Sequence, residues 1–81
     1  MLAFDAPAAN PAVVARTDLA AHAETYLLVM PAGRTTWVPD PEAATAFVSM
    51  REATRMAMRL PAAQRAYGLP REAELAVHRA H

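Results

Sequence analysis

The chain contains no cysteine, no lysine and no isoleucine, and its 81 residues include only one serine and two glycines. Without cysteine there can be no disulfide framework, no thiolate metal site and no cysteine nucleophile. Gly33 and Gly68 are too far apart to form a glycine-rich phosphate loop. These absences exclude thiol chemistry and a phosphate loop of that type, and they make a cytoplasmic setting the default expectation.

Long apolar runs are missing as well. No stretch approaches the roughly eighteen apolar residues that a membrane-spanning helix requires. The first fifteen residues carry Asp5 and two prolines but no basic residue, a pattern unlike that of a signal peptide. We therefore expect a soluble protein that has no membrane partner.

Groups suited to catalysis are equally scarce. Ser49, the only serine, is explained better as a helix cap than as a nucleophile. His78 and His81 have a spacing that can place two imidazoles on one metal ion, but only His22 could add a third nitrogen. An active site needs convergent polar groups in a pocket. The sequence therefore predicts a protein that is not an enzyme and that holds neither a cofactor nor a metal.

Alanine is what the chain has in abundance. The hydrophobic fraction is 54%, but 21 of those residues are alanines, each of which buries little area. A domain of this length is only marginally stable alone, so we expect a partner, which could be a second copy in a homodimer. The bias toward alanine, arginine and proline indicates a GC-rich bacterial or phage genome.

The charges are distributed unevenly although their sum is zero. Residues 1–48 hold two arginines and five acidic residues, a balance of −3. Residues 49–81 hold six arginines and three acidic residues, a balance of +3. This asymmetry indicates either an anionic partner for the C-terminal half or attraction between the two halves.

The chain is expected to form one small α+β domain behind an N-terminal arm. Residues 1–16 are rich in alanine and proline without a clear period, so we expect a flexible or loosely docked arm there. The domain covers residues 17–81. Its predicted architecture is a two-stranded antiparallel β-hairpin packed against two to three short helices.

A hairpin is predicted in the first half of the domain. Residues 25–30 form an apolar run of strand length. Pro31-Ala32-Gly33 is typical of a tight turn, and the residues that follow favour a second strand over 34–38. Trp37, near the end of that strand, should face the helices.

Two start signals predict consecutive helices. In Asp40-Pro41-Glu42 a capping carboxylate precedes a proline and a further acid, which predicts a helix over 41–48. Ser49, followed three residues later by Glu52, forms a capping box and predicts a fresh helix over 50–60.

The last third of the chain allows two interpretations. Residues 62–67 could form a short helix ended by Gly68, or residues 65–69 could form a third strand that pairs with the hairpin edge. A last helix is expected over 70–80. In the first case, residues 62–80 would have the outline of a degenerate helix-turn-helix.

The candidate binding residues follow from the spacing of the arginines. Arg51, Arg55 and Arg59 are four residues apart, so they form one row on a helix. Guanidinium groups bind phosphates and carboxylates bidentately, although such a row can also be an ordinary solvated face. Met58 at the edge of the row and Trp37 at a strand end are the apolar side chains that could accompany it.

We therefore expect a small non-catalytic protein-binding module that acts through this arginine-striped helix. A regulatory or accessory protein, such as a phage-type inhibitor, would fit these features. The alternative is a small nucleic-acid-binding regulator in which Arg65 and Arg71 add to the row. The neutral net charge favours a protein partner over a nucleic acid.

Overall fold

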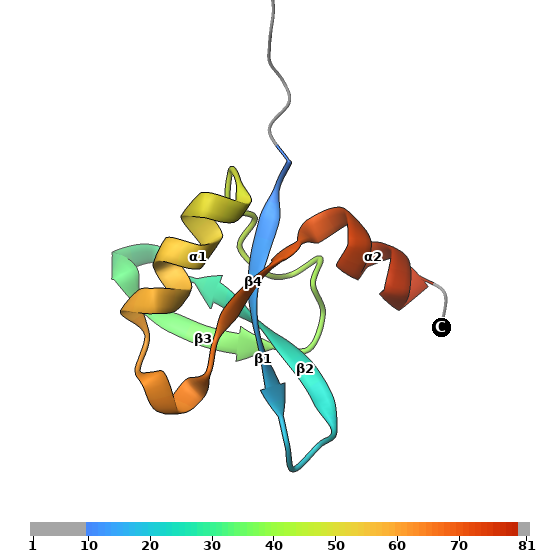
Figure 1. Cartoon of the computed structure of the whole chain (residues 1–81), viewed down its shortest axis with the longest axis horizontal. Coiled ribbons are helices and arrows are strands. Elements are labelled where there is room, and N and C mark those ends of the chain that lie inside the picture. Colours follow the sequence, from blue (N-terminus) through green and yellow to red (C-terminus); the bar gives the residue numbers. More distant parts are fainter. Residues whose placement is uncertain (1–9, 80–81) are drawn as a thin grey trace, which may run out of the picture.

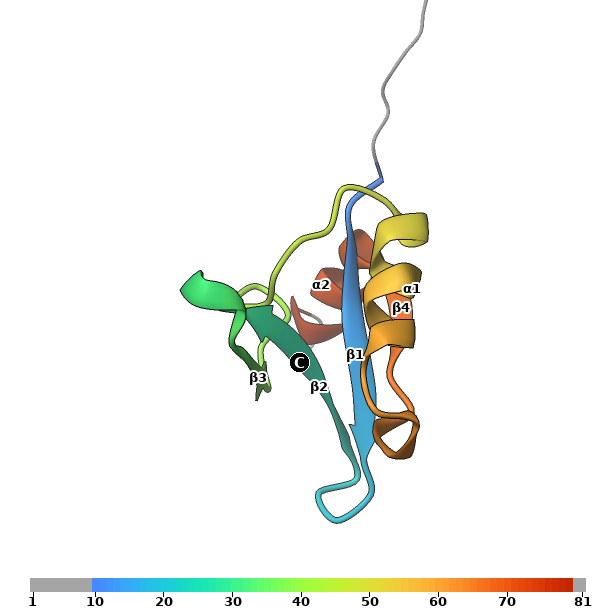
Figure 2. The ribbon, with the colours of Figure 1, turned by 90° about the vertical axis from the view of Figure 1, so that its left-hand side faces the viewer.

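A computed structural model describes residues 10–79, which form a four-stranded antiparallel sheet with one helix on each side (Figure 1, Figure 2). In chain order the elements are β1 (Ala12–Asp18), β2 (Ala23–Val29), the short 3-10 turn η2 (Pro31–Gly33), β3 (Thr35–Val38), α1 (Met50–Arg59), the 3-10 turn η3 (Ala62–Gln64), β4 (Tyr67–Pro70) and α2 (Arg71–Arg79). The strands are arranged in the order β3-β2-β1-β4. The α+β class is confirmed, but the sheet has four strands where the sequence predicted two or three.

The sheet has an apolar cluster on each face, because neighbouring residues of a strand point to opposite sides. The cluster under α1 consists of Ala12, Val14, Leu27, Ala53 and Ala57. The cluster on the other face consists of Val13, Ala15, Tyr26 and Ala44. The second face is also the side of α2, which buries Leu75. Both clusters depend on β1, which contributes two residues to each.

β1 corrects the boundary that composition suggested. Residues 12–16, expected to belong to a loosely docked arm, form part of this strand, which lies between β2 and β4 in the middle of the sheet. Its first four residues are 0% exposed. Small alanines beside two valines allow other elements to pack closely on both faces, so this short apolar run is fully buried. Residues 1–9 of the expected arm lie outside the described residues.

The hairpin over residues 25–38 is confirmed, with β2 and β3 in antiparallel register from Tyr26↔Val38 to Val29↔Thr35. In the connecting turn, the Gly33 amide donates to the carbonyl of Met30 at 3.1 Å. Both Ala32 (φ 69°) and Gly33 (φ 79°) adopt the left-handed conformation. The turn therefore uses an alanine at a position where glycine is less strained.

The helix predicted over 41–48 is wrong. The Asp40 carboxylate does accept from the Glu42 amide at 2.9 Å, but the result is a single turn. The chain then extends, and the Thr45 amide donates to the carbonyl of Leu27 at 3.0 Å. The Thr45 hydroxyl accepts from the Val29 amide at 2.7 Å. These long-range bonds outweigh the local helix signal, because a helix would leave the backbone groups of β2 without partners.

The same extended segment also pairs with β1. Phe47 and Ala12 form an isolated antiparallel bridge, with N···O distances of 2.9 and 2.7 Å. β1 and β2 are in register only between residues 15–18 and 23–26, and Figure 2 shows them diverging beyond that point. Residues 45–47 thus join the separated ends of the two strands.

The capped helix predicted over 50–60 is confirmed as α1, and the Ser49 hydroxyl accepts from the Glu52 amide at 3.3 Å. α1 lies close to β4, since a Cβ placed on Gly68 would be only 3.3 Å from the Cβ of Ala53. The absent side chain at Gly68 is therefore what allows the helix to approach the strand.

The helix considered for residues 62–67 is wrong, and the strand considered for 65–69 is correct apart from its bounds and its partner. β4 pairs with β1 in the register Ala12↔Pro70 to Ala15↔Tyr67, not with the hairpin edge. The helix predicted over 70–80 is confirmed for residues 71–79 as α2, whereas Pro70 ends β4 and residue 80 lies outside the described residues. Because a strand occupies the place of the first helix, residues 62–80 do not form a helix-turn-helix. None of the helices within residues 10–79 has the length and apolar character needed to span a membrane.

Candidate functional site

The predicted arginine row lies on the exposed side of α1. Arg51, Arg55 and Arg59 are all exposed, and Met58 on the same side is 79% exposed. The opposite side of the helix carries the buried alanines that pack on the sheet. At 1.5 Å rise per residue, the row extends over about 12 Å of the helix. The residues singled out for α1 are therefore brought together on one accessible surface.

One side of α1 forms a small pocket with residues 45–47, the segment that bonds to both β1 and β2. Phe47 and Met56, both half-buried, supply its apolar lining, and Arg55, Arg59 and Glu52 supply its charged groups. The volume of the pocket is about 200 Å³. The sequence did not predict this arrangement, because Phe47 was placed in a helix and not opposite α1.

A further arginine lies on the same side of the sheet. The guanidinium carbon of Arg16 is 4.8 Å from the ring centre of Trp37, which indicates a cation–π contact. Trp37 is half-buried and packs against the cluster under α1. It therefore faces the side of the sheet that α1 covers, so the prediction that it faces the helices holds for α1 and not for α2. Arg16 was missed because it fell within the residues assigned to the arm.

The arginine side chains of this face make no hydrogen bond to another part of residues 10–79. Within residues 10–79, the side-chain hydrogen bonds are made by hydroxyl, carboxyl and imidazole groups, and none is made by an arginine side chain. One explanation of the uneven charge is attraction between the two halves of the chain. Within residues 10–79, no hydrogen bond from an arginine side chain to a carboxylate contributes to such an attraction.

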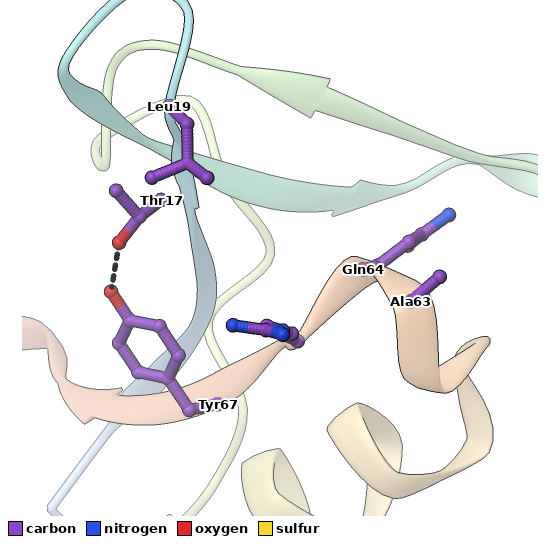
Figure 3. A pocket seen from close by; sticks show the side chains of 6 residues that line it. Thr17, Leu19, Ala63, Gln64 and Tyr67 are labelled. Carbon is purple, nitrogen blue, oxygen red and sulfur yellow. Dashed lines mark hydrogen bonds between the residues drawn. The ribbon is translucent and has the colours of Figure 1, made fainter.

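The two arginines named for nucleic-acid binding lie away from the row. Arg65 is exposed in a left-handed conformation (φ 52°) at the end of η3, and it lines a separate pocket of about 620 Å³ with Thr17, Leu19, Ala63, Gln64 and Tyr67 (Figure 3). Arg71 begins α2 on the other side of the sheet, where its amide donates to the carbonyl of Pro11 at 3.0 Å. Neither residue extends the row on α1.

Thr17 and Tyr67 form a hydrogen-bonded pair that lines the pocket in Figure 3. The hydroxyls of Thr17 and Tyr67 are 3.2 Å apart, and the Tyr67 hydroxyl also donates to the carboxylate of Glu24. Burial raises the pKa of Tyr67, and the hydrogen bond to Glu24 adds to the rise. The phenol therefore stays protonated and acts as a donor.

A second tyrosine holds α2 to the sheet. Tyr26 is 2% exposed, and its hydroxyl donates to Oε1 of Glu74 at 2.7 Å. His78 lies beside it, with Nε2 3.4 Å from the hydroxyl and the two rings in edge contact. Burial and then the hydrogen bond to Glu74 raise the pKa of Tyr26 far above its usual value of 10.0. The Tyr26 phenol therefore stays protonated near neutral pH and acts as a hydrogen-bond donor from the sheet to α2.

The histidines do not assemble a metal site within the described part of the chain. Residues 10–79 contain no group of three side chains placed to hold a metal ion. His22 and His78 line one pocket of about 580 Å³ near Glu24, while His81 lies outside the described residues.

Comparison with known proteins gives no relative for this arrangement. No protein-family model matches the chain, and no curated protein sequence and no solved structure is significantly similar to it. The chemistry of its own exposed groups is therefore the basis on which its function is inferred.

Proposed function

We propose that this protein is a small non-catalytic binding module, a regulatory or accessory protein of the cytoplasm, that binds another protein through the arginine face of α1. This face is defined by Arg51, Arg55, Arg59 and Met58, with Trp37 and Arg16 on the adjoining sheet. A phage-type inhibitor would be one protein of this kind.

The observation that supports the proposal is that exposed arginines and an exposed methionine lie together on one helix. Three exposed guanidinium groups make no hydrogen bond within residues 10–79, so they can bond to a second molecule. Met58 places a flexible apolar side chain among them, and methionine adapts readily to the shape of a partner. Arginine and apolar groups together are enriched in protein interfaces.

The experiment is affinity capture from a lysate of the encoding organism with three versions of the full chain. The first is the parent, the second carries Arg51→Glu, Arg55→Glu and Arg59→Glu, and the third is a matched control. The control reverses three exposed arginines outside the face, namely Arg34, Arg65 and Arg79. We expect the parent and the control to retain the same protein and the α1 variant to lose it.

The opposite result would refute the proposal. If the α1 variant retains the same proteins as the parent, the arginine face is not the binding surface. If the retained material is nucleic acid that the α1 variant loses, the alternative function replaces this one. Loss of nucleic acid from the Arg34, Arg65 and Arg79 variant alone would place that function outside the arginine face, and Arg65→Glu by itself would then test the residue predicted for it.

We also propose that two copies associate through the hairpin. β3 is an edge strand of the sheet, and its sequence Thr-Thr-Trp-Val favours strand pairing. Light scattering at high micromolar concentration should give the mass of a dimer. A mass that stays at 8.7 kDa at every concentration would contradict this proposal.

A further inference from the structure

The pocket on the flank of α1 indicates what kind of partner the arginine face accepts. Its volume of about 200 Å³ is below the roughly 300–1,000 Å³ of pockets that enclose small molecules. It has room for one large side chain and not for a whole ligand. Phe47 and Met56 supply the apolar part of its lining, and Glu52, Arg55 and Arg59 supply the charged part. An apolar side chain that enters the pocket would therefore pack on Phe47 and Met56 with charged groups beside it.

The charges beside the pocket define the surroundings of that side chain. Arg55 and Arg59 both line it, and residues four apart on a helix are separated by about 6 Å. Carboxylates at two positions four apart on a partner helix have the same separation, so each could meet one guanidinium group in a bidentate pair. The pocket and the row together match an apolar anchor flanked by acids.

A nucleic acid fits the same surface less well. Glu52 lines the pocket with the two arginines and would repel a phosphate backbone that ran along the row. A peptide avoids this repulsion, since it can place a neutral residue or a backbone amide opposite Glu52. An apolar side chain of a peptide would also cover Phe47 and Met56, whereas a phosphate would leave them in contact with water.

From this complementarity we infer that the arginine face binds an acidic amphipathic helix of a protein partner, with a single large apolar side chain seated between Phe47 and Met56 and carboxylates on Arg55 and Arg59. The inference rests on the proposed function and narrows it to one chemical class of partner. It does not require the identity of the partner to be known.

The test uses labelled synthetic peptides of about 16 residues, long enough to form a helix on binding, and the full chain as the binding protein. One peptide carries a central leucine with glutamates four residues apart around it. A second has the leucine replaced by alanine, a third has the glutamates replaced by glutamines, and a fourth is a scramble of the first. A single-stranded and a duplex DNA complete the set. Affinity is measured by fluorescence anisotropy at about 0.15 M salt, where exposed charges are partly screened.

We expect the first peptide to bind. Each of the three altered peptides should bind with an affinity at least roughly tenfold lower. Arg55→Glu with Arg59→Glu should weaken the first peptide by roughly tenfold or more. Arg34→Glu with Arg79→Glu, which changes the charge equally outside the face, should stay within about twofold of the parent. Circular dichroism of each variant confirms that α1 and α2 are retained.

Three results would overturn the inference. The first is no binding of the acidic peptide at millimolar concentration, the second is equal binding of the scramble, and the third is tighter binding of DNA than of any peptide. Failure of the peptides while affinity capture still depends on the α1 arginines would leave the proposed function standing and remove only this partner class. Failure of both would remove the binding face itself.

Discussion

The absence of lysine and cysteine makes the alkaline stability of this protein a direct measure of its two tyrosines. Between pH 9 and 12 the ionisable groups that remain are Tyr26 and Tyr67, because arginine stays charged to higher pH and the α-amino group titrates near pH 8. Burial raises the pKa of both tyrosines in the folded state above the usual value of 10.0. Above pH 10 the folded chain therefore holds more protons than the unfolded chain, and the free energy of unfolding falls as the pH rises.

Tyr26 should account for most of this dependence, since it is 2% exposed and its carboxylate partner adds to the effect of burial. Above pH 10, a tyrosine that keeps its proton only in the folded state lowers the free energy of unfolding by about 1.4 kcal/mol per pH unit. Over the two pH units from 10 to 12 the loss from Tyr26 alone is therefore on the order of 2–3 kcal/mol. A domain of this size has about 4–12 kcal/mol in total, so the loss is easily measured.

The assay is urea denaturation of the parent, Tyr26→Phe and Glu74→Gln at one-unit steps from pH 7 to 12. Tyr26→Phe should lose about 1.5–3 kcal/mol at pH 7, because Glu74 loses a donor, and its stability should then fall much less toward pH 12. Glu74→Gln should keep most of the alkaline fall, since burial is the largest cause of the raised pKa of Tyr26. Equal alkaline losses in the parent and in Tyr26→Phe would refute the reasoning.

Three further predictions concern the backbone, each checked by urea denaturation. Ala32→Gly should raise the free energy of unfolding by about 0.5–1 kcal/mol, because φ at Ala32 is 69°. Gly33→Ala should lower it by about 1 kcal/mol, because φ at Gly33 is 79°, and a gain in stability from this change would contradict the turn geometry. Thr45→Val should cost about 1–3 kcal/mol by leaving the Val29 amide without its acceptor, with exposed Thr54→Val as the control; equal effects would show that the bond contributes nothing. Gly68→Val should cost about 1–3 kcal/mol by pushing α1 away from β4, and an unchanged midpoint would mean that the helix does not pack there.

Features encoded by neighbouring residues could be predicted from the sequence. The hairpin turn at Pro31–Gly33 and the Ser49 cap depend on contacts within four residues, and both appear in the structure. The arginine row depends only on helical spacing, so its exposure followed once α1 was placed.

Features that depend on residues distant in the sequence could not be predicted. The Asp40 cap signal was sound locally, but one turn satisfies it, and Thr45 then bonds to β2 in place of continuing a helix. β1 was missed because its apolar run is only four residues long and stands in a stretch rich in alanine and proline that has no clear period, although all four residues are fully buried. The same error removed Arg16 from the candidate site. The pocket beside α1 was missed because Phe47 reaches it only through its pairing with Ala12.

Residues 45–47 form a seam between two parts of the sheet, one made of β1 and β4 and the other of β2 and β3. Away from their connecting turn, β1 and β2 do not pair with each other and are held together through Thr45 and Phe47. Opening of that seam would expose the amides of Ala12, Val29 and Phe47 in one cooperative event, below the energy of global unfolding. Since Phe47 also lines the pocket on α1, a ligand seated there would close the seam and slow hydrogen exchange at amides that it never touches.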